Sequence, residues 1–123
     1  MFLNCSNHKS ENWTKEQLDA VMDLGESVIE DYAFPNVPAD ADENHLLKLA
    51  ERVCDEIMEK KPGVVMCQGE FTLTHKLVNE LLKNGVCVVA ACTERVTSER
   101  VMPDGTVKKD SIYKFVRFRK YIQ

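Results

Sequence analysis

The sequence lacks any long hydrophobic run, and this argues against a membrane-spanning helix. No apolar stretch approaches the roughly 18 residues that a transmembrane helix needs. The N-terminus, MFLNCSNHKS, also has no basic region ahead of its short apolar run, as a secretory signal would have. We therefore expect a cytoplasmic protein with no membrane partner.

Motifs that usually identify a cofactor or metal site are absent as well. The chain has only five glycines and contains neither a Walker loop nor a G-x-G-x-x-G motif. Its five cysteines form no C-x-x-C pair, and its three histidines lack the spacing of metal ligands. Isolated cysteines in apolar segments are typical of buried, reduced thiols. We expect no metal and no cofactor.

Charge is distributed unevenly along the chain. Residues 1–93 carry 8 basic and 16 acidic side chains, a balance of −8, whereas residues 94–123 carry 8 and 4, a balance of +4. Proteins that bind duplex DNA present a broad basic surface, because their affinity comes largely from neutralising phosphates. The acidic body argues against duplex DNA and is compatible with a small anionic ligand.

Apolar segments and amphipathic segments alternate through the first ninety residues, and 123 residues suffice for one domain. This alternation predicts an α/β, Rossmann-like, three-layer domain over residues 1–123, with a mostly parallel sheet in the order 2-1-3-4. The expected strands are residues 1–5, 27–32, 64–68 and 86–92. The expected helices are residues 14–25, with Leu18, Val21 and Met22 facing inward, 44–60 and 72–84.

No helical pattern follows Cys92. Residues 95–102 and 111–121 are predicted strands around a turn at Pro103 to Gly105, so that residues 94–121 form a basic antiparallel hairpin. Simple alternation would put Phe115 and Phe118 on opposite faces of the last strand, each among cations. Such faces suit a subunit interface, a nucleobase or RNA, or the protection of an edge strand by charge.

Ligands of open α/β sheets bind at the carboxyl ends of the strands where the strand order reverses, here between the first and third strands. Three loops end there. In the middle loop, the start of the third helix presents free N–H groups to an anion, unless Thr72 only caps that helix. The candidate ligand-binding residues of the three loops are Ser6, Asn7, His8, Gly69, Glu70, Phe71, Thr72, Thr93, Glu94 and Arg95.

Two of these residues allow several roles. Glu70 could accept hydrogen bonds from a ribose hydroxyl or an adenine amino group, act as a nucleophile toward a glycosidic carbon, or be an exposed turn residue. His8 could contact phosphate or transfer a proton, which makes it the candidate catalytic residue, or it could be a solvated loop residue.

Five segments together resemble small CRISPR-associated ancillary proteins of the Csx type. They are Phe2 to His8, Phe34 to Val37, Gln68 to Thr72, Thr93 to Arg95 and Phe115 to Arg119. This resemblance implies a CARF-like homodimer in type III CRISPR antiviral signalling that binds a cyclic oligoadenylate such as cyclic tetra-adenylate. It implies either sequestration of that ring or its cleavage by a metal-independent ring nuclease, and it places the three loops above against the ligand.

Two other functions fit the same residues. The first is an enzyme similar to nucleoside 2-deoxyribosyltransferases, with Glu70 as the nucleophile. The second is a non-catalytic interaction module whose C-terminal hairpin binds a protein. Because no acid–base pair can be identified in the sequence, ligand binding is better supported than turnover.

Overall fold

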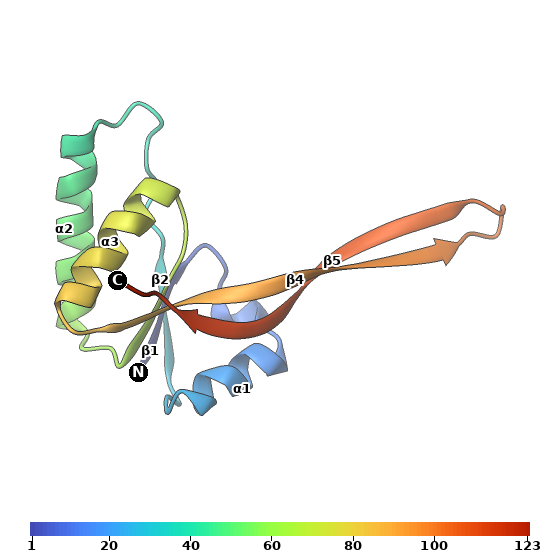
Figure 1. Cartoon of the computed structure of the whole chain (residues 1–123), viewed down its shortest axis with the longest axis horizontal. Helices are drawn as coiled ribbons and strands as arrows, with labels where there is room; N and C mark the ends of the chain where they lie inside the picture. Colours follow the sequence, from blue (N-terminus) through green and yellow to red (C-terminus); the bar gives the residue numbers. More distant parts are fainter.

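A five-stranded sheet with helices on both faces forms the body of the protein (Figure 1). The computed structural model describes all 123 residues. The strands are β1 (Phe2–Ser6), β2 (Ile29–Ala33), β3 (Val64–Cys67), β4 (Cys87–Val101) and β5 (Val107–Lys120). They follow the order β2-β1-β3-β4-β5, in which only β5 is antiparallel to its neighbour. The predicted α/β class, strand order and C-terminal hairpin are confirmed.

The helices begin at residues that satisfy their free N–H groups. In α1 (Lys15–Asp23) the Thr14 hydroxyl accepts a hydrogen bond from Gln17 N at 3.3 Å, and in α2 (Glu43–Glu59) the Asp42 carboxylate accepts one from His45 N at 2.8 Å. A short 3-10 turn, η1 (Ser10–Asn12), precedes α1, and α3 (Phe71–Lys83) follows β3. No helix combines the length and the apolar composition that crossing a membrane requires.

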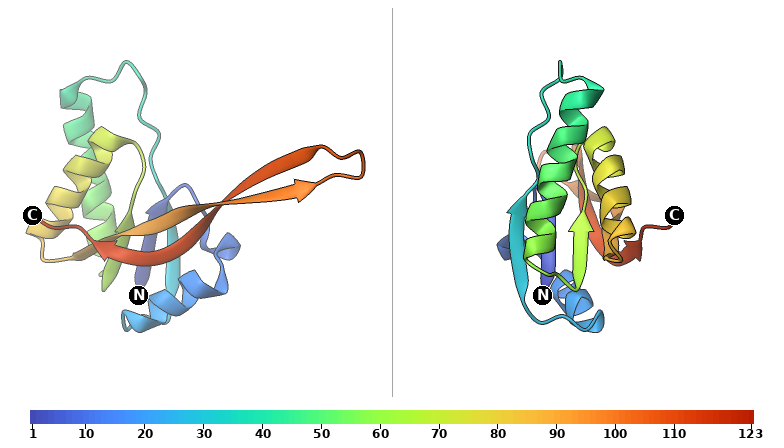
Figure 2. Two further views of the ribbon diagram at one scale, coloured as in Figure 1. Left: turned by 45° about the vertical axis from the view of Figure 1, so that its right-hand side comes forward. Right: turned by 90° about the vertical axis from the view of Figure 1, so that its left-hand side faces the viewer.

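Strand alternation divides the core between the two faces of the sheet. Leu3, Cys5 and Val65 belong to the larger cluster, beneath α2 and α3. Phe2 and Met66 belong to a smaller cluster beneath α1. The right-hand view of Figure 2 shows α2 and α3 side by side on one face, with α1 below and apart from them. Because α1 is short, it leaves part of its face of the sheet uncovered.

Of the three α1 residues expected to face inward, only Val21 is buried. Ala20 and Leu24 pack against the same cluster as Val21. Leu18 and Met22 are 38% and 64% exposed, so the expectation was wrong for these two. The reason is that Ala20, Val21 and Leu24 form one stripe of the helix, and Leu18 and Met22 lie outside it.

The hairpin strands are longer than the sequence pattern predicted. β4 runs without interruption through Cys92 to Arg95, where a break was expected. A bulge opposite Cys92 and Thr93, which pair with Arg117 and Phe115, leaves Val116 as an extra residue.

This bulge reverses the predicted alternation of β5. Phe115 and Phe118 therefore share one face, are both buried, and have ring centroids 5.0 Å apart. Their predicted placement on opposite faces was wrong, because alternation holds only where the ladder has no extra residue.

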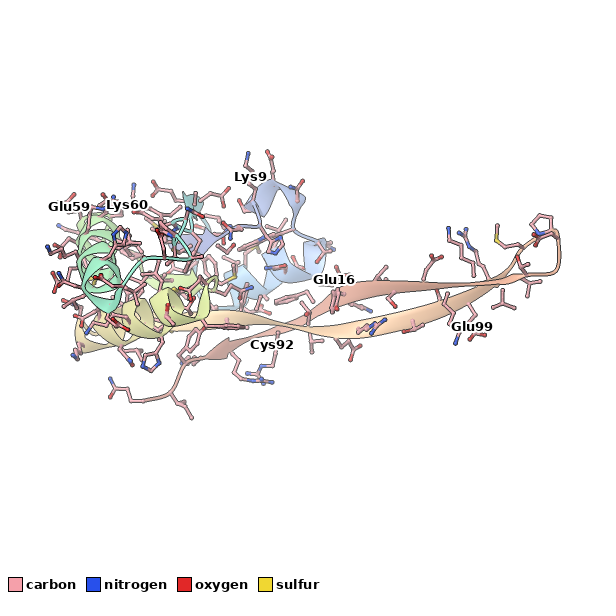
Figure 3. The ribbon with its side chains drawn as sticks, turned by 90° about the horizontal axis from the view of Figure 1, so that it is seen from above. Lys9, Glu16, Glu59, Lys60, Cys92 and Glu99 are labelled. Atoms are coloured by element: carbon pink, nitrogen blue, oxygen red, sulfur yellow. The ribbon has the colours of Figure 1, made fainter.

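Beyond the bulge the hairpin leaves the body. We call residues 94–114 the arm; Figure 3 shows it projecting past the helices, with Cys92 near its base and Glu99 toward its tip. Gly105, at φ +85°, closes the predicted turn. Almost all arm side chains are exposed.

We predict that Gly69→Ala destabilises the protein through a clash with Phe34. A Cβ at Gly69 would lie 2.4 Å from Cδ1 of the buried Phe34 ring. Overpacking of this kind costs about 1–3 kcal/mol of unfolding free energy, which urea denaturation measures. In a Phe34→Ala background the same change should cost much less. An equal cost in both backgrounds would contradict the assignment.

Candidate functional site

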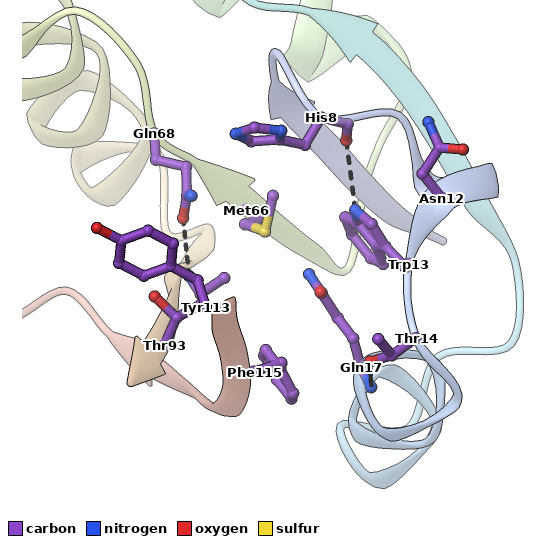
Figure 4. Close-up of a pocket in the computed structure, with 11 residues that line it drawn as sticks. His8, Asn12, Trp13, Thr14, Gln17, Met66, Gln68, Thr93, Tyr113 and Phe115 are labelled. Carbon is purple, nitrogen blue, oxygen red and sulfur yellow. Dashed lines mark hydrogen bonds between the residues drawn. The ribbon is translucent and has the colours of Figure 1, made fainter. Parts of the chain in front are cut away.

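A pocket of about 420 Å³ opens on the α1 face, at the carboxyl ends of β1 and β3 (Figure 4). This is the point where the strand order reverses, as predicted for a ligand site. The volume lies within the usual range for small-molecule sites, about 300–1,000 Å³. The pocket is lined by His8, Asn12, Trp13, Thr14, Gln17, Met66, Gln68, Ala91, Thr93, Tyr113 and Phe115.

A buried polar network fixes the loop that carries His8. Asn4 and Ser6 are the two buried polar residues of the chain. The Asn4 amide donates to the His8 carbonyl at 2.8 Å, while the Ser6 hydroxyl donates to Asn4 Oδ1 at 2.6 Å and accepts from His8 N at 3.2 Å. The backbone of His8 is thereby held from both sides, and its side chain is left free to enter the pocket.

The same network anchors the turn leading to α1. Asn4 also donates to Asp31 Oδ1 at 2.9 Å, and the Asp31 carboxylate accepts from the backbone N–H and the hydroxyl of Ser10. The indole of Trp13 donates to the His8 carbonyl at 3.3 Å, the bond drawn in Figure 4. Strands β1 and β2 therefore jointly position both His8 and Trp13.

Aromatic side chains provide much of the pocket's apolar surface. Trp13 is fixed by edge-on packing against Phe2 at 5.9 Å and by contact with Phe118 at 6.2 Å between ring centroids. Phe115 is buried, whereas Tyr113, from the base of the arm, is 74% exposed. Such an arrangement suits a flat, partly apolar ligand.

Polar side chains line the pocket on both sides, with Gln68 and Thr93 beside Tyr113 and Gln17 beside Trp13 (Figure 4). Gln68 Oε1 accepts a hydrogen bond from Ala91 N at 2.8 Å, which orients the side-chain amide so that its NH₂ group remains available to a ligand. Thr93 and Gln17 add a hydroxyl and a second amide. His8 is the only basic side chain among the lining residues. The pocket thus offers hydrogen bonds with little charge.

Arg95 adds a cation just beyond the pocket. It pairs in register with Tyr113, so the two side chains lie on the same face of the arm. Its guanidinium donates from Nε and Nη2 to the Ser111 hydroxyl, at 3.1 and 3.0 Å. The remaining N–H groups can meet an anion that extends out of the pocket.

Two of the three predicted loops meet in this pocket. His8 and Thr93 line it, and Arg95 lies on the same face beside it. Ser6 is buried beneath the loop, and Asn7 is exposed without lining the pocket. Glu94 points to the opposite face of the arm because strand residues alternate.

The third predicted loop, Gly69 to Thr72, lies elsewhere. Phe71, which is 89% exposed, and Thr72 border a separate apolar groove between α2 and α3. Gly69 packs directly under the Phe34 ring, and the chain continues there toward the α2 side of the sheet. The structure therefore does not bring this loop together with His8 and Thr93.

Glu70 caps α3 with its own side chain. Its carboxylate accepts hydrogen bonds from Thr72 N at 2.8 Å, Leu73 N at 3.0 Å and the Thr72 hydroxyl at 2.8 Å. These bonds, the one from Thr72 N above all, lower the pKa of Glu70. The cap is therefore Glu70 and not Thr72, and donors that we expected to be free for an anion are already occupied.

Sequence reasoning nominated His8 and Thr93 and missed the other nine of the eleven residues that line the pocket. Gln68 could have been found, since it is the last residue of a predicted strand. Trp13 and Gln17 depend on where α1 docks, and Tyr113 and Phe115 on the register of the hairpin; neither can be derived from local pattern. The missed residues are Asn12, Trp13, Thr14, Gln17, Met66, Gln68, Ala91, Tyr113 and Phe115.

We predict that the Glu70 cap contributes to stability only when it is ionised. Glu70→Ala should lower the unfolding free energy by about 1 kcal/mol at neutral pH, as for other lost caps. Since the folded state lowers the pKa of Glu70, this contribution is complete above the unfolded pKa of about 4.3 and disappears as pH falls through the folded value.

Urea denaturation of wild type and variant between pH 7 and pH 2.5 measures the difference. Glu51→Ala is the control, because Glu51 is an exposed residue of α2 with no hydrogen-bond partner. A difference between wild type and Glu70→Ala that persists unchanged at the lowest pH would contradict the cap.

Comparison with known proteins relates the chain to one family. A protein described as Uncharacterized protein MJ1673, from Methanocaldococcus jannaschii, is 31% identical over 90 residues, which cover 72% of this chain and 67% of the relative. No solved structure matches the chain. The description assigns no activity, so the resemblance to Csx-type proteins stays a prediction. Residues 1–119 match the family described as Uncharacterized protein MJ1673 family, and the chain belongs to it.

Proposed function

We propose that the protein binds an adenine nucleotide in the pocket beside His8, and that a cyclic oligoadenylate such as cyclic tetra-adenylate is its ligand. The observation that carries the proposal is the buried Asn4–Ser6 pair, which holds the His8 loop at the edge of the pocket. Buried polar side chains are costly unless fully hydrogen-bonded. The two buried side chains are spent on fixing the His8 loop, and this supports the proposal that binding needs this loop conformation.

The pocket's chemistry suits a purine. Trp13 and Tyr113 offer aromatic faces, and stacking of one base on such a side chain contributes about 1–3 kcal/mol. Gln68 suits adenine, because its free NH₂ group can donate to a ring nitrogen of that base such as N7. Neither contact depends on charge, in agreement with a pocket that has few ionisable groups.

The phosphates would leave the pocket along the base of the arm. Arg95 shares the face of Tyr113 and retains free N–H groups. His8 lies at the mouth of the pocket and can donate to a phosphate oxygen when protonated. Two separated donors suit a phosphodiester chain better than a triphosphate, which needs a dense cluster of donors.

Sequestration is better supported than cleavage. Metal-independent cleavage needs a base to take the proton of a ribose 2′-hydroxyl and an acid to protonate the departing oxygen. His8 is the only imidazole among the lining residues, and no carboxylate or amine accompanies it there. The role in type III CRISPR signalling, the cytoplasmic location and the homodimer rest on the resemblance and are part of this proposal.

The alternative enzyme, with Glu70 as a nucleophile, has less support. Glu70 does not line the pocket, and both of its carboxylate oxygens already accept hydrogen bonds. A nucleophilic carboxylate would need a free oxygen facing the glycosidic carbon. The observed contacts support a capping role.

We predict that Tyr113→Ala and His8→Ala each weaken the binding of cyclic tetra-adenylate by roughly 5- to 150-fold, the effect of losing about 1–3 kcal/mol. Both side chains are exposed, so neither change should affect folding. Calorimetry with cyclic tetra-adenylate, linear oligoadenylate and AMP measures affinity, and chromatography of the ring after long incubation measures cleavage.

Phe71→Ala is the matched control. Phe71 is an exposed aromatic residue and belongs to the groove on the other side of the sheet. It should leave affinity unchanged. Loss of binding in Phe71→Ala alone would move the site to the α3 loop, and weak, equal binding of all three ligands by wild type would refute the proposed function. Slower cleavage by His8→Ala at unchanged affinity would establish a ring nuclease.

A further inference from the structure

The arm presents two faces with different neighbours. The pocket face carries Thr93, Tyr113 and Arg95. We call the opposite side the outer face; it consists of the cross-strand pairs Glu94–Lys114, Val96–Ile112, Ser98–Asp110 and Arg100–Lys108. We propose that the outer face packs against the outer face of a second copy of this chain, around a two-fold axis through the Val96–Ile112 pair.

The arm lacks the burial that stabilises a ribbon of this length. From Thr93 to Val101 it extends eight residues, about 27 Å at ~3.4 Å per residue. An isolated two-stranded hairpin is marginally stable in water, and independent stability needs a further layer. Ile112, at the middle of the outer face, is 61% exposed. A partner that covers this face would supply the missing layer.

The outer face is complementary to itself. A two-fold axis through Val96 and Ile112 brings each of these residues onto its own copy, so the centre of the contact is apolar. The same operation places Lys114 over Asp110 of the second copy, and Asp110 over Lys114, because each lies two residues from Ile112 along β5. Glu94 meets Ser98 in the same way. The contact therefore has an apolar centre flanked by two equivalent ion pairs.

Charges within one chain leave these groups available. Lys114 and Glu94 form no ion pair in their own chain, and Asp110 is 3.5 Å from Arg100 in an exposed pair of the kind that contributes little. Asp110 and Lys114 lie four residues apart on one strand, about 14 Å at ~3.4 Å per residue, too far for direct contact. An ion pair between Asp110 and Lys114 can therefore form only between two chains.

Pairing along the free edge of β5 is a less suitable alternative. Lys114, Arg117, Arg119 and Lys120 follow one another along the end of β5 without an acidic residue between them. Two such edges side by side would repel, and charges of this kind are a common means of preventing strand addition. Face-to-face packing, with the ribbons crossing at about 30° as in sheet packing, avoids that repulsion.

The test combines two charge reversals and needs no ligand. By sedimentation equilibrium over about 1–200 µM, wild type should be a dimer with a roughly micromolar dissociation constant, as expected for a small interface. Lys114→Asp and Asp110→Lys should each raise that constant at least about tenfold, because like charges then oppose one another. An equimolar mixture of the two variants should form a heterodimer close to wild type in affinity, since both contacts become Asp–Lys pairs.

Two further variants test the apolar centre. Ile112→Asp should abolish the dimer, whereas Val107→Asp, on the pocket face near the tip, should not change it. Circular dichroism verifies that all variants fold. A wild-type monomer at 200 µM, or charge variants that fail to associate when mixed, would overturn the proposal. Dimerisation without adenylate binding would refute the proposed function and leave this inference intact.

Discussion

The geometry of the candidate site depends on the side-chain amide of Asn4. This residue is buried at the middle of β1, where an apolar side chain would be expected. Its amide donates to the His8 carbonyl and to Asp31, and its oxygen accepts from Ser6. The network therefore fixes the loop after β1 to Asp31 at the middle of β2. Since an unpaired buried amide would cost roughly 1–3 kcal/mol, the loop and the residue stabilise one another.

The β-bulge at Val116 has a comparable effect on the other wall. By inserting one residue it turns Phe115 and Phe118 to the same side, where Phe118 packs against Phe2 and Trp13. Trp13 in turn lies beside His8. The hairpin is therefore an integral part of the domain. Phe115 and Phe118, at its base, belong to the smaller core cluster, and Phe115 also lines the pocket.

Sequence patterns predicted the features of the fold that depend on the local periodicity of apolar residues. Alternating apolar strands and capped helices predicted the sheet order and the Thr14 cap, and the structure confirms both. The patterns failed at three contacts that leave no periodic signal. Gly69 lies against the Phe34 ring, and the bulge opposite Cys92 and Thr93 changes the facing of β5. Glu70 caps α3 through its close neighbours Thr72 and Leu73, and it thereby occupies the helix terminus that was the candidate anion site.

The proposed ligand site and the proposed dimer contact lie on opposite faces of the arm. Tyr113 belongs to the pocket face and its neighbour Ile112 to the outer face, so a dimer formed through the outer face leaves both pockets directed away from the interface. Each chain would then bind its own ligand with its own His8, Gln68 and Tyr113. A ring bound in this way would place one adenine in a pocket and its phosphodiester chain against His8 and Arg95 of the same chain. The dimer would act on binding only by fixing the arm, and with it Tyr113 and Arg95.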